Sequence, residues 1–145
     1  MGDNYMEFDY RTIQGHDKIV SALGKWPSFH DFEVVSIILQ RDMSEDMTGP
    51  SLEVELYGFR SEVRPEDPTR HECLIKLVFR SIEDLRLEAF NHQNAINGIT
   101  LESRWSDRLA CAVLDVKFIG GFGVSCQFQC TEMEVLSVQP WKALK

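Results

Sequence analysis

Apolar and polar residues alternate with a period of two along most of this chain, and this pattern constrains the fold more than any other feature. In residues 51–59, Leu52, Val54 and Leu56 alternate with acidic and aromatic residues. Successive side chains of a β-strand point to opposite faces, so the pattern predicts a strand with one buried face and one wet face. Similar strand-like segments, about eight in all, are 32–41, 72–80, 84–90, 96–102, 109–119, 124–130 and 133–138.

The connections between these segments predict how the strands pair. Strands close in sequence tend to form antiparallel hairpins, which we expect for 72–80 with 84–90 and across the glycine-rich turn 120–123. Residues 15–23 predict one short helix, which Gly24 would end. The predicted fold is therefore mainly β (α+β at most). It is an antiparallel β sandwich or strongly curved sheet of about eight strands with one short N-terminal helix.

Residues 32–41 differ from the other segments because apolar residues occupy both faces of the predicted strand. The apolar residues there are Val34, Val35, Ile37, Ile38 and Leu39. A strand with few polar positions on either face is typical of a central strand that is covered on both sides. We therefore expect this segment to lie at the centre of a sheet.

The length of 145 residues predicts a single domain over 1–145, with 1–14 as a possible N-terminal arm. No apolar run approaches the roughly 20 residues that cross a bilayer, and the polar N-terminus lacks a signal-peptide pattern. We expect a cytoplasmic protein that does not bind membranes.

The net charge bears on the kind of partner. Fifteen Lys and Arg against 23 Asp and Glu give a formal charge of −8. Such a balance argues against binding of nucleic acid through its phosphates and favours a basic partner. A charge of this size also keeps a small domain in solution without any role in binding, and the sequence leaves that interpretation open.

Four cysteines lie within strand-like segments: Cys73, Cys111, Cys126 and Cys130. Without a signal peptide, reduced and buried thiols are the favoured interpretation. Metal binding by Cys126 and Cys130 is the alternative, but these residues would lie ~13 Å apart in a straight strand, too far for one tetrahedral ion. We expect no metal and no cofactor.

The stretch from Trp26 to Val35 gathers several uncommon residue types, including Pro27, Phe29 and the adjacent His30 and Asp31. His30 and Asp31 could form an acid–base pair or serve as two metal ligands. Adjacent residues at the start of a strand point to opposite faces, however, so they could not share one proton or one ion without a bend in the backbone. The alternative is a structural role, in which Asp31 ties a turn and His30 bonds a backbone carbonyl. The polar run 91–94 likewise predicts a turn between strands. We therefore predict no catalytic residues.

A binding role fits the remaining pattern better. The wet face of the strand at 51–59 is acidic, and aromatic side chains can anchor an interface. The predicted partner contacts are Glu53, Glu55, Tyr57 and Trp105.

Several motifs resemble those of the immunity protein 50 family, small bacterial proteins of polymorphic toxin systems. The most specific match is Lys25-Trp26-Pro27-Ser28-Phe29-His30-Asp31-Phe32-Glu33-Val34, in which Phe32 stands where a small residue, usually alanine, is expected. Weaker matches follow at 77–79, 84–85, 90–96, 121–123, 128–130 and Val135, so that the resemblance spans 20–138.

The resemblance implies a non-enzymatic protein that binds and neutralises a cognate toxin, and the acidic charge suggests a basic toxin domain. The competing hypothesis is a small β-fold enzyme or ligand-binding protein with a pocket around His30, Asp31 and Glu33.

Overall fold

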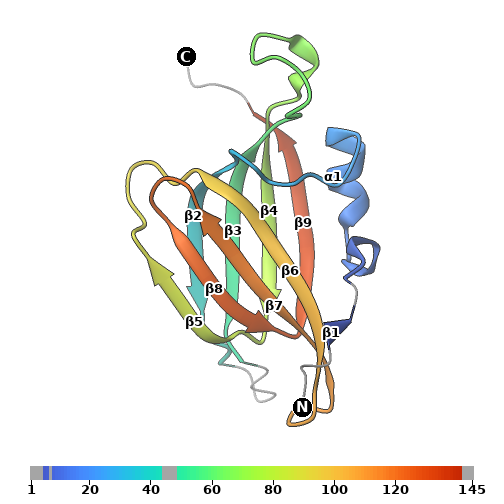
Figure 1. The fold of residues 1–145 in the computed structure, drawn as a ribbon, viewed down its shortest axis with the longest axis vertical. Helices are drawn as coiled ribbons and strands as arrows, with labels where there is room; N and C mark the ends of the chain where they lie inside the picture. Colours follow the sequence, from blue (N-terminus) through green and yellow to red (C-terminus); the bar gives the residue numbers. More distant parts are fainter. Residues whose placement is uncertain (1–4, 7, 44–48, 142–145) are drawn as a thin grey trace.

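The computed structural model describes residues 5–6, 8–43 and 49–141. These residues form a β sandwich with one α-helix, as predicted (Figure 1). The parts of the predicted arm at 1–4 and 7 lie outside the described residues. Within the arm, β1 (Tyr5–Met6) and a 3₁₀ turn η1 (Tyr10–Thr12) precede the helix α1 (His16–Leu23).

The described strands form two antiparallel sheets. The four-stranded sheet has the order β2-β3-β4-β9, with β2 at Glu33–Gln40, β3 at Ser51–Gly58, β4 at Cys73–Arg80 and β9 at Glu132–Pro140. The five-stranded sheet has the order β1-β6-β7-β8-β5, with β5 at Glu83–Glu88, β6 at Ile96–Ser106, β7 at Cys111–Gly120 and β8 at Ser125–Cys130. A second 3₁₀ turn, η2 (Pro68–Arg70), lies in the β3–β4 connection.

The core lies between the two sheets and is filled by the inward positions of the alternating strands. On β3 the buried residues are Leu52, Val54 and Leu56, as the sequence pattern predicts. Phe79 of β4 meets Phe128 of β8 edge to face across the core, with ring centroids 4.9 Å apart. Such aromatic pairs add to the stabilisation that comes from burying their surface.

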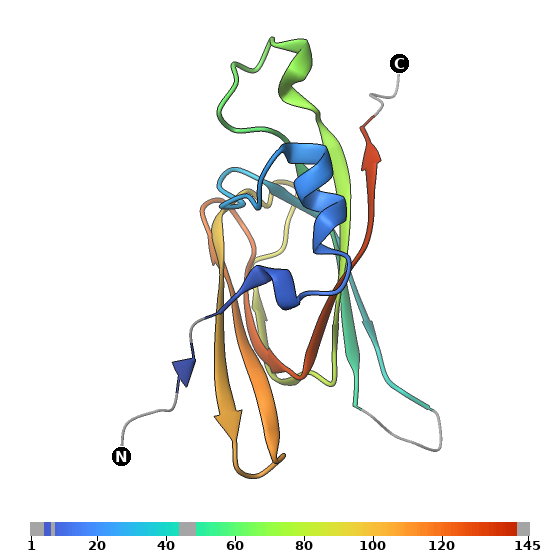
Figure 2. The ribbon, with the colours of Figure 1, turned by 90° about the vertical axis from the view of Figure 1, so that its right-hand side faces the viewer.

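Helix α1 covers one long side of the sandwich, beside β9, which is an outer strand of the four-stranded sheet (Figure 2). Ile19 and Leu23 form its buried face. The helix ends at Gly24, whose φ of 84° is left-handed and whose N–H donates to the Val20 carbonyl. The predicted glycine stop is therefore confirmed.

Two predictions about the arrangement of the strands are wrong. β2 is an outer strand of its sheet and not a central one, since only β3 pairs with it over most of its length. β4 and β5 do not form a hairpin, because the chain crosses from one sheet to the other between them and β5 pairs with β8. Ser81, with a left-handed φ of 56°, makes this sharp change of direction.

The predicted inward face of 84–90 is correct only in part for the same reason. Leu85 is half-buried against the core, but Leu87 and Ala89 are exposed because β5 is an outer strand. The glycine-rich turn 120–123 does join the antiparallel strands β7 and β8, so that hairpin is confirmed. None of the helices in the described part of the chain is long and apolar enough to cross a bilayer.

Candidate functional site

Residues 26–32, the corner segment, link α1 to β2 through packed aromatic rings. Trp26 stacks on Tyr10 of η1, with ring centroids 5.2 Å apart, and meets Phe29 edge to face at 5.6 Å. Phe29 in turn meets Phe32 at 5.4 Å. Phe29 and Phe32 are buried, whereas Trp26 and Pro27 are half-buried. The aromatic residues of this stretch therefore lock the helix to the sandwich.

The backbone of the corner segment is unusual at two positions. Phe29 and Asp31 both have a φ of 65°, in the left-handed region that costs a non-glycine residue about 1 kcal/mol or more. Burial of the Phe29 ring offsets this cost, together with backbone hydrogen bonds from Phe32 N to Phe29 O and from Asp31 N to Ile96 O. The turn is consequently held in one conformation.

This turn brings His30 and Asp31 together, which the expected opposite orientation does not allow. His30 Nδ1 lies 3.3 Å from Asp31 Oδ2, and both side chains are exposed. Among the described residues, the His30 side chain has no hydrogen bond to a backbone carbonyl, and the tie of Asp31 to Ile96 uses the Asp31 backbone N–H.

A third catalytic partner is not brought to this pair by the described residues. Glu33 points elsewhere, since its Oε1 accepts a hydrogen bond from the Asn94 backbone N–H at 3.3 Å. The surface pocket described below is lined by other residues. General acid–base chemistry needs a substrate site within reach of the pair, so the geometry gives the enzyme hypothesis no support.

The turn predicted at 91–94 is confirmed, and Asn94 is its central residue. Asn94 is 3% exposed and is the buried polar residue of the described chain. Its Oδ1 accepts from the backbone N–H groups of Asn91 and Val124, at 2.9 and 3.2 Å, and its Nδ2 donates to the Asn91 carbonyl. One amide thus joins the β5–β6 connection to the β7–β8 turn.

Three of the segments that resemble family motifs, 25–34, 90–96 and 121–123, meet at this end of the sandwich. The Ala95 carbonyl accepts from Gly121 N and Phe122 N, and the Val34 N–H donates to the Asn94 carbonyl. A Cβ on Gly123 would lie 2.2 Å from the Gln93 carbonyl oxygen, so this close approach requires glycine. The contacts among these three segments therefore support the fold.

Phe32 also has a specific partner. A Cβ on Gly58 of β3 would lie 2.6 Å from the Phe32 ring, so the large ring at position 32 fits because position 58 has no side chain. On its other side Phe32 contacts Phe59, over whose ring the Arg70 guanidinium lies at 3.9 Å.

Three of the predicted partner contacts share one surface. Glu53, Glu55 and Tyr57 of β3 point outward, and the strand register places them beside Ile38, Ser36 and Glu33 of β2. We call this surface of β2 and β3 the acidic face, with residues Glu33, Ser36, Ile38, Glu53, Glu55 and Tyr57. Its neighbouring cation is Lys76 of β4, which lies opposite Glu55.

A second cation of β4 is already paired. Arg80 lies 2.7 Å from Glu134 and 3.6 Å from Glu132, so it neutralises acids of β9. Of the two β4 cations, Lys76 is therefore the one beside the three acids of the acidic face. Tyr57 meets Trp141 edge to face at 5.5 Å, and burial, with a hydrogen bond to Glu72, raises the pKa of its hydroxyl.

Trp105 does not belong to this surface. It is 48% exposed and lies on β6, in the other sheet, opposite Ala112. The sequence pattern could not show this, because sheet order depends on pairing between distant segments.

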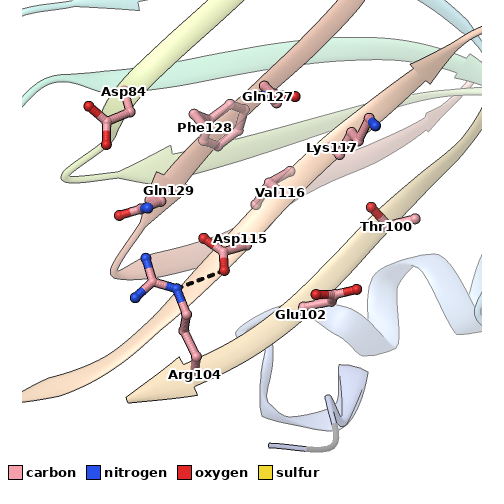
Figure 3. Close-up of a pocket in the computed structure, with 10 residues that line it drawn as sticks. All are labelled: Asp84, Thr100, Glu102, Arg104, Asp115, Val116, Lys117, Gln127, Phe128 and Gln129. Atoms are coloured by element: carbon pink, nitrogen blue, oxygen red, sulfur yellow. Dashed lines mark hydrogen bonds and ion pairs between the residues drawn. The ribbon is translucent and has the colours of Figure 1, made fainter. Parts of the chain in front are cut away.

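The outer face of the five-stranded sheet carries a polar pocket of about 500 Å³ (Figure 3). Arg104 Nε donates to Asp115 Oδ2 at 2.8 Å, and Glu102 and Lys117 lie on the same strands. Charges of both signs mix here, which distinguishes this surface from the acidic face.

The cysteines occupy strands, and the described structure has no disulfide among them. Cys73, Cys126 and Cys130 are buried, as predicted, and Cys111 is half-buried. Burial raises the pKa of Cys73 and Cys126 to about 11, and that of Cys130 to about 12. Within the described residues, no cluster of three or more His, Cys, Asp or Glu side chains could hold a metal ion.

The comparisons with known proteins give one match. No curated protein and no solved structure matches the chain. Residues 15–141 match the family described as immunity protein 50, which is most of the chain and includes the corner segment, the Asn94 turn and the acidic face. The match supports an immunity function, and the chain belongs to the immunity protein 50 family.

Proposed function

We propose that this protein binds and neutralises a cognate bacterial toxin whose contact surface is basic, and that it acts in the cytoplasm of the cell it protects. Family membership carries the immunity role. The acidic face supports the basic partner, because Glu33, Glu53 and Glu55 share one face of β2 and β3, and Lys76 of β4 lies opposite Glu55 alone among them.

Electrostatic complementarity of this kind mainly raises the rate of association and selects among partners. Neutralisation requires only that the bound protein blocks the active site of the toxin or its substrate path. It requires no chemistry from the immunity protein, in keeping with the exposed and isolated His30–Asp31 pair.

The test uses the purified toxin domain encoded by the gene next to that of this protein. We expect the two proteins to form a complex. Its association rate should fall as the salt concentration is raised about tenfold from a low value, because screening shortens the reach of exposed charges. Binding that is indifferent to salt would contradict the basic contact surface. Absence of any complex would contradict the proposed function.

A charge-reversal pair localises the contact. Glu53→Lys should slow association roughly tenfold or more, because it changes the sign of the centre of the acidic face. Glu102→Lys is the matched control, since it makes the same change of net charge on the outer face of the other sheet. Equal effects of the two substitutions would mean that net charge alone, and not the acidic face, steers the toxin.

A further inference from the structure

Outer strands of a sheet expose unpaired backbone groups, and proteins usually protect them. Three of the four outer strands in the described structure are protected. On β9, the Val135 N–H donates to the Gln14 carbonyl at 2.8 Å, and Lys18 Nζ donates to the Leu136 carbonyl at 3.1 Å. On the other sheet, β1 pairs with β6 and is itself only two residues long.

The strand β5 is protected by charge. Four of its six residues are charged, namely Glu83, Asp84, Arg86 and Glu88. Its pairing with β8 is also irregular between Glu83 and Arg86. Charged side chains and irregular pairing both hinder the addition of another strand.

The strand β2 has little of this protection. Its one charged residue, Glu33, lies at its start, and its pairing with β3 is irregular between Val34 and Ser36 and regular from Ser36 to Gln40. From Val35 onward, apolar side chains are exposed on both faces: Val35 is 45%, Ile38 52% and Leu39 50% exposed. A regular, apolar and exposed outer strand is a template for pairing with another chain.

The register shows which backbone groups of β2 are available. Val34 donates its N–H away from β3, to the Asn94 carbonyl, so Val34 and Leu56 form a pair without mutual hydrogen bonds. Because such pairs alternate with hydrogen-bonded pairs in an antiparallel ladder, the N–H and C=O groups of Ile37 and Leu39 also point away from β3. Within the described residues these groups have no hydrogen-bond partner.

We infer that an extended segment of the toxin adds to the four-stranded sheet as a strand beside β2, with basic side chains directed to the acidic face. This inference rests on the proposed function and names the mode of binding. In such β-addition the main chain supplies affinity, and alternate side chains supply specificity. Here Ile38 and Val35 would offer apolar contact, and Glu53 and Glu55 would offer charge.

The charge of the acidic face selects this occupant over a second copy of the chain. Two copies joined at β2 would place their acidic faces side by side in one continuous sheet, and each copy has a net charge of −8. Like charges oppose that arrangement, whereas a strand carrying lysine or arginine is attracted to it.

Proline at position 39 tests the main-chain contact. Leu39→Pro removes one outward N–H and keeps the ladder with β3, so it is compatible with an outer strand. We expect it to weaken binding of the neighbouring-gene toxin domain at least roughly fivefold, the loss of about one hydrogen bond. Leu39→Ala, which keeps the N–H, is the matched control and should have a clearly smaller effect. Equal effects of proline and alanine would overturn the proposal.

Amide hydrogen exchange gives a second measurement that does not depend on a variant. In the complex, the Ile37 and Leu39 amides of the unmodified protein should exchange at least roughly tenfold more slowly than in the free protein. The Arg86 and Leu87 amides of β5 should keep their rates.

The outcomes separate the two proposals. A toxin that binds while the β2 amides keep their exchange rates overturns strand addition and leaves the immunity function standing. A toxin that does not bind overturns both. A free protein that sediments as a dimer, and as a monomer after Leu39→Pro, shows a second copy on β2 and also overturns the inference.

Discussion

The two outer strands of the four-stranded sheet, β9 and β2, have equivalent places in the topology and opposite surroundings. β9 is covered by helix α1, by the backbone of Gln14 and by Lys18. Among the described residues, the outer edge of β2 is bonded only at its start, where the Val34 N–H donates to the Asn94 carbonyl, and Val35, Ile38 and Leu39 beyond that point are exposed.

The two outer strands therefore differ in how much they contribute to folding and in how far they are open to a binding partner. The α1 side buries apolar surface within the chain, so it contributes to folding. The β2 side leaves comparable residue types in contact with water, so it contributes little to folding and is free to contribute to binding. Substitutions on each side of the sheet test this difference.

The largest expected effect contrasts an isoleucine from each side. Ile19→Ala in α1 should lower the free energy of unfolding by about 3 kcal/mol, because Ile19 is fully buried against the core. Ile38→Ala in β2 should lower it by less than about 0.5 kcal/mol, since that side chain is half in water. Urea unfolding of the two variants measures both values. Similar losses would show that β2 is as important to folding as the covered side.

The second largest loss of stability is expected at Asn94, whose carbonyl bonds to the start of β2. Asn94→Ala should destabilise the protein by about 2 kcal/mol, because it leaves the buried N–H groups of Asn91 and Val124 without their acceptor. Asn97→Ala is the control, as Asn97 is exposed. Thermal unfolding followed by circular dichroism distinguishes them. If the Asn94→Ala variant unfolds at the same temperature as the unmodified protein, the Asn94 side-chain amide does not stabilise this end of β2.

Alkaline pH should lower the stability of the protein through a buried cysteine of the core. Burial raises the pKa of Cys126 from 9.0 to about 11, so its stabilising effect is complete below pH 9 and is lost as the pH rises toward 11. The free energy of unfolding should fall by about 1 kcal/mol per pH unit for this thiol. In the Cys126→Ala variant that part of the decline should disappear. Val116→Ala, which removes a buried side chain without a titrating group, should retain the decline.

The smallest effect is expected at the exposed pair beside the start of β2. His30→Ala should change the free energy of unfolding by less than about 0.5 kcal/mol, because an exposed ion pair contributes little. The structural role considered for His30 requires the variant to unfold instead. Urea unfolding decides between these outcomes, and toxin binding by the folded variant shows whether the pair also lies outside the contact surface.

The positions of the strands and of α1 could be predicted from the sequence because alternation, glycine stops and turns are local signals. The order of the strands could not, since it depends on contacts between distant segments. The place of β2 illustrates the point. Its apolar residues on both faces are typical of a central strand, and the structure instead leaves Ile38 and Leu39 exposed.

The candidate site was predictable to a similar degree. The alternation in β3 places Glu53, Glu55 and Tyr57 on one face, and the structure agrees. The contact of His30 with Asp31 depends on the left-handed backbone of Phe29 and Asp31, for which the sequence has no signal. The exposed residues of β2, which belong to the proposed strand addition, were not among the predicted contacts, although an apolar strand next to an acidic one was the available indication.

The fit between Phe32 and Gly58 couples the substitutions that the two positions can accept. While the phenylalanine ring is in place, a Cβ at position 58 would lie 2.6 Å from it, so alanine at 58 would force the ring or the strand to shift. With a small residue at position 32, position 58 could carry a side chain without meeting a ring. A larger residue at 58 is therefore best accommodated when position 32 changes with it.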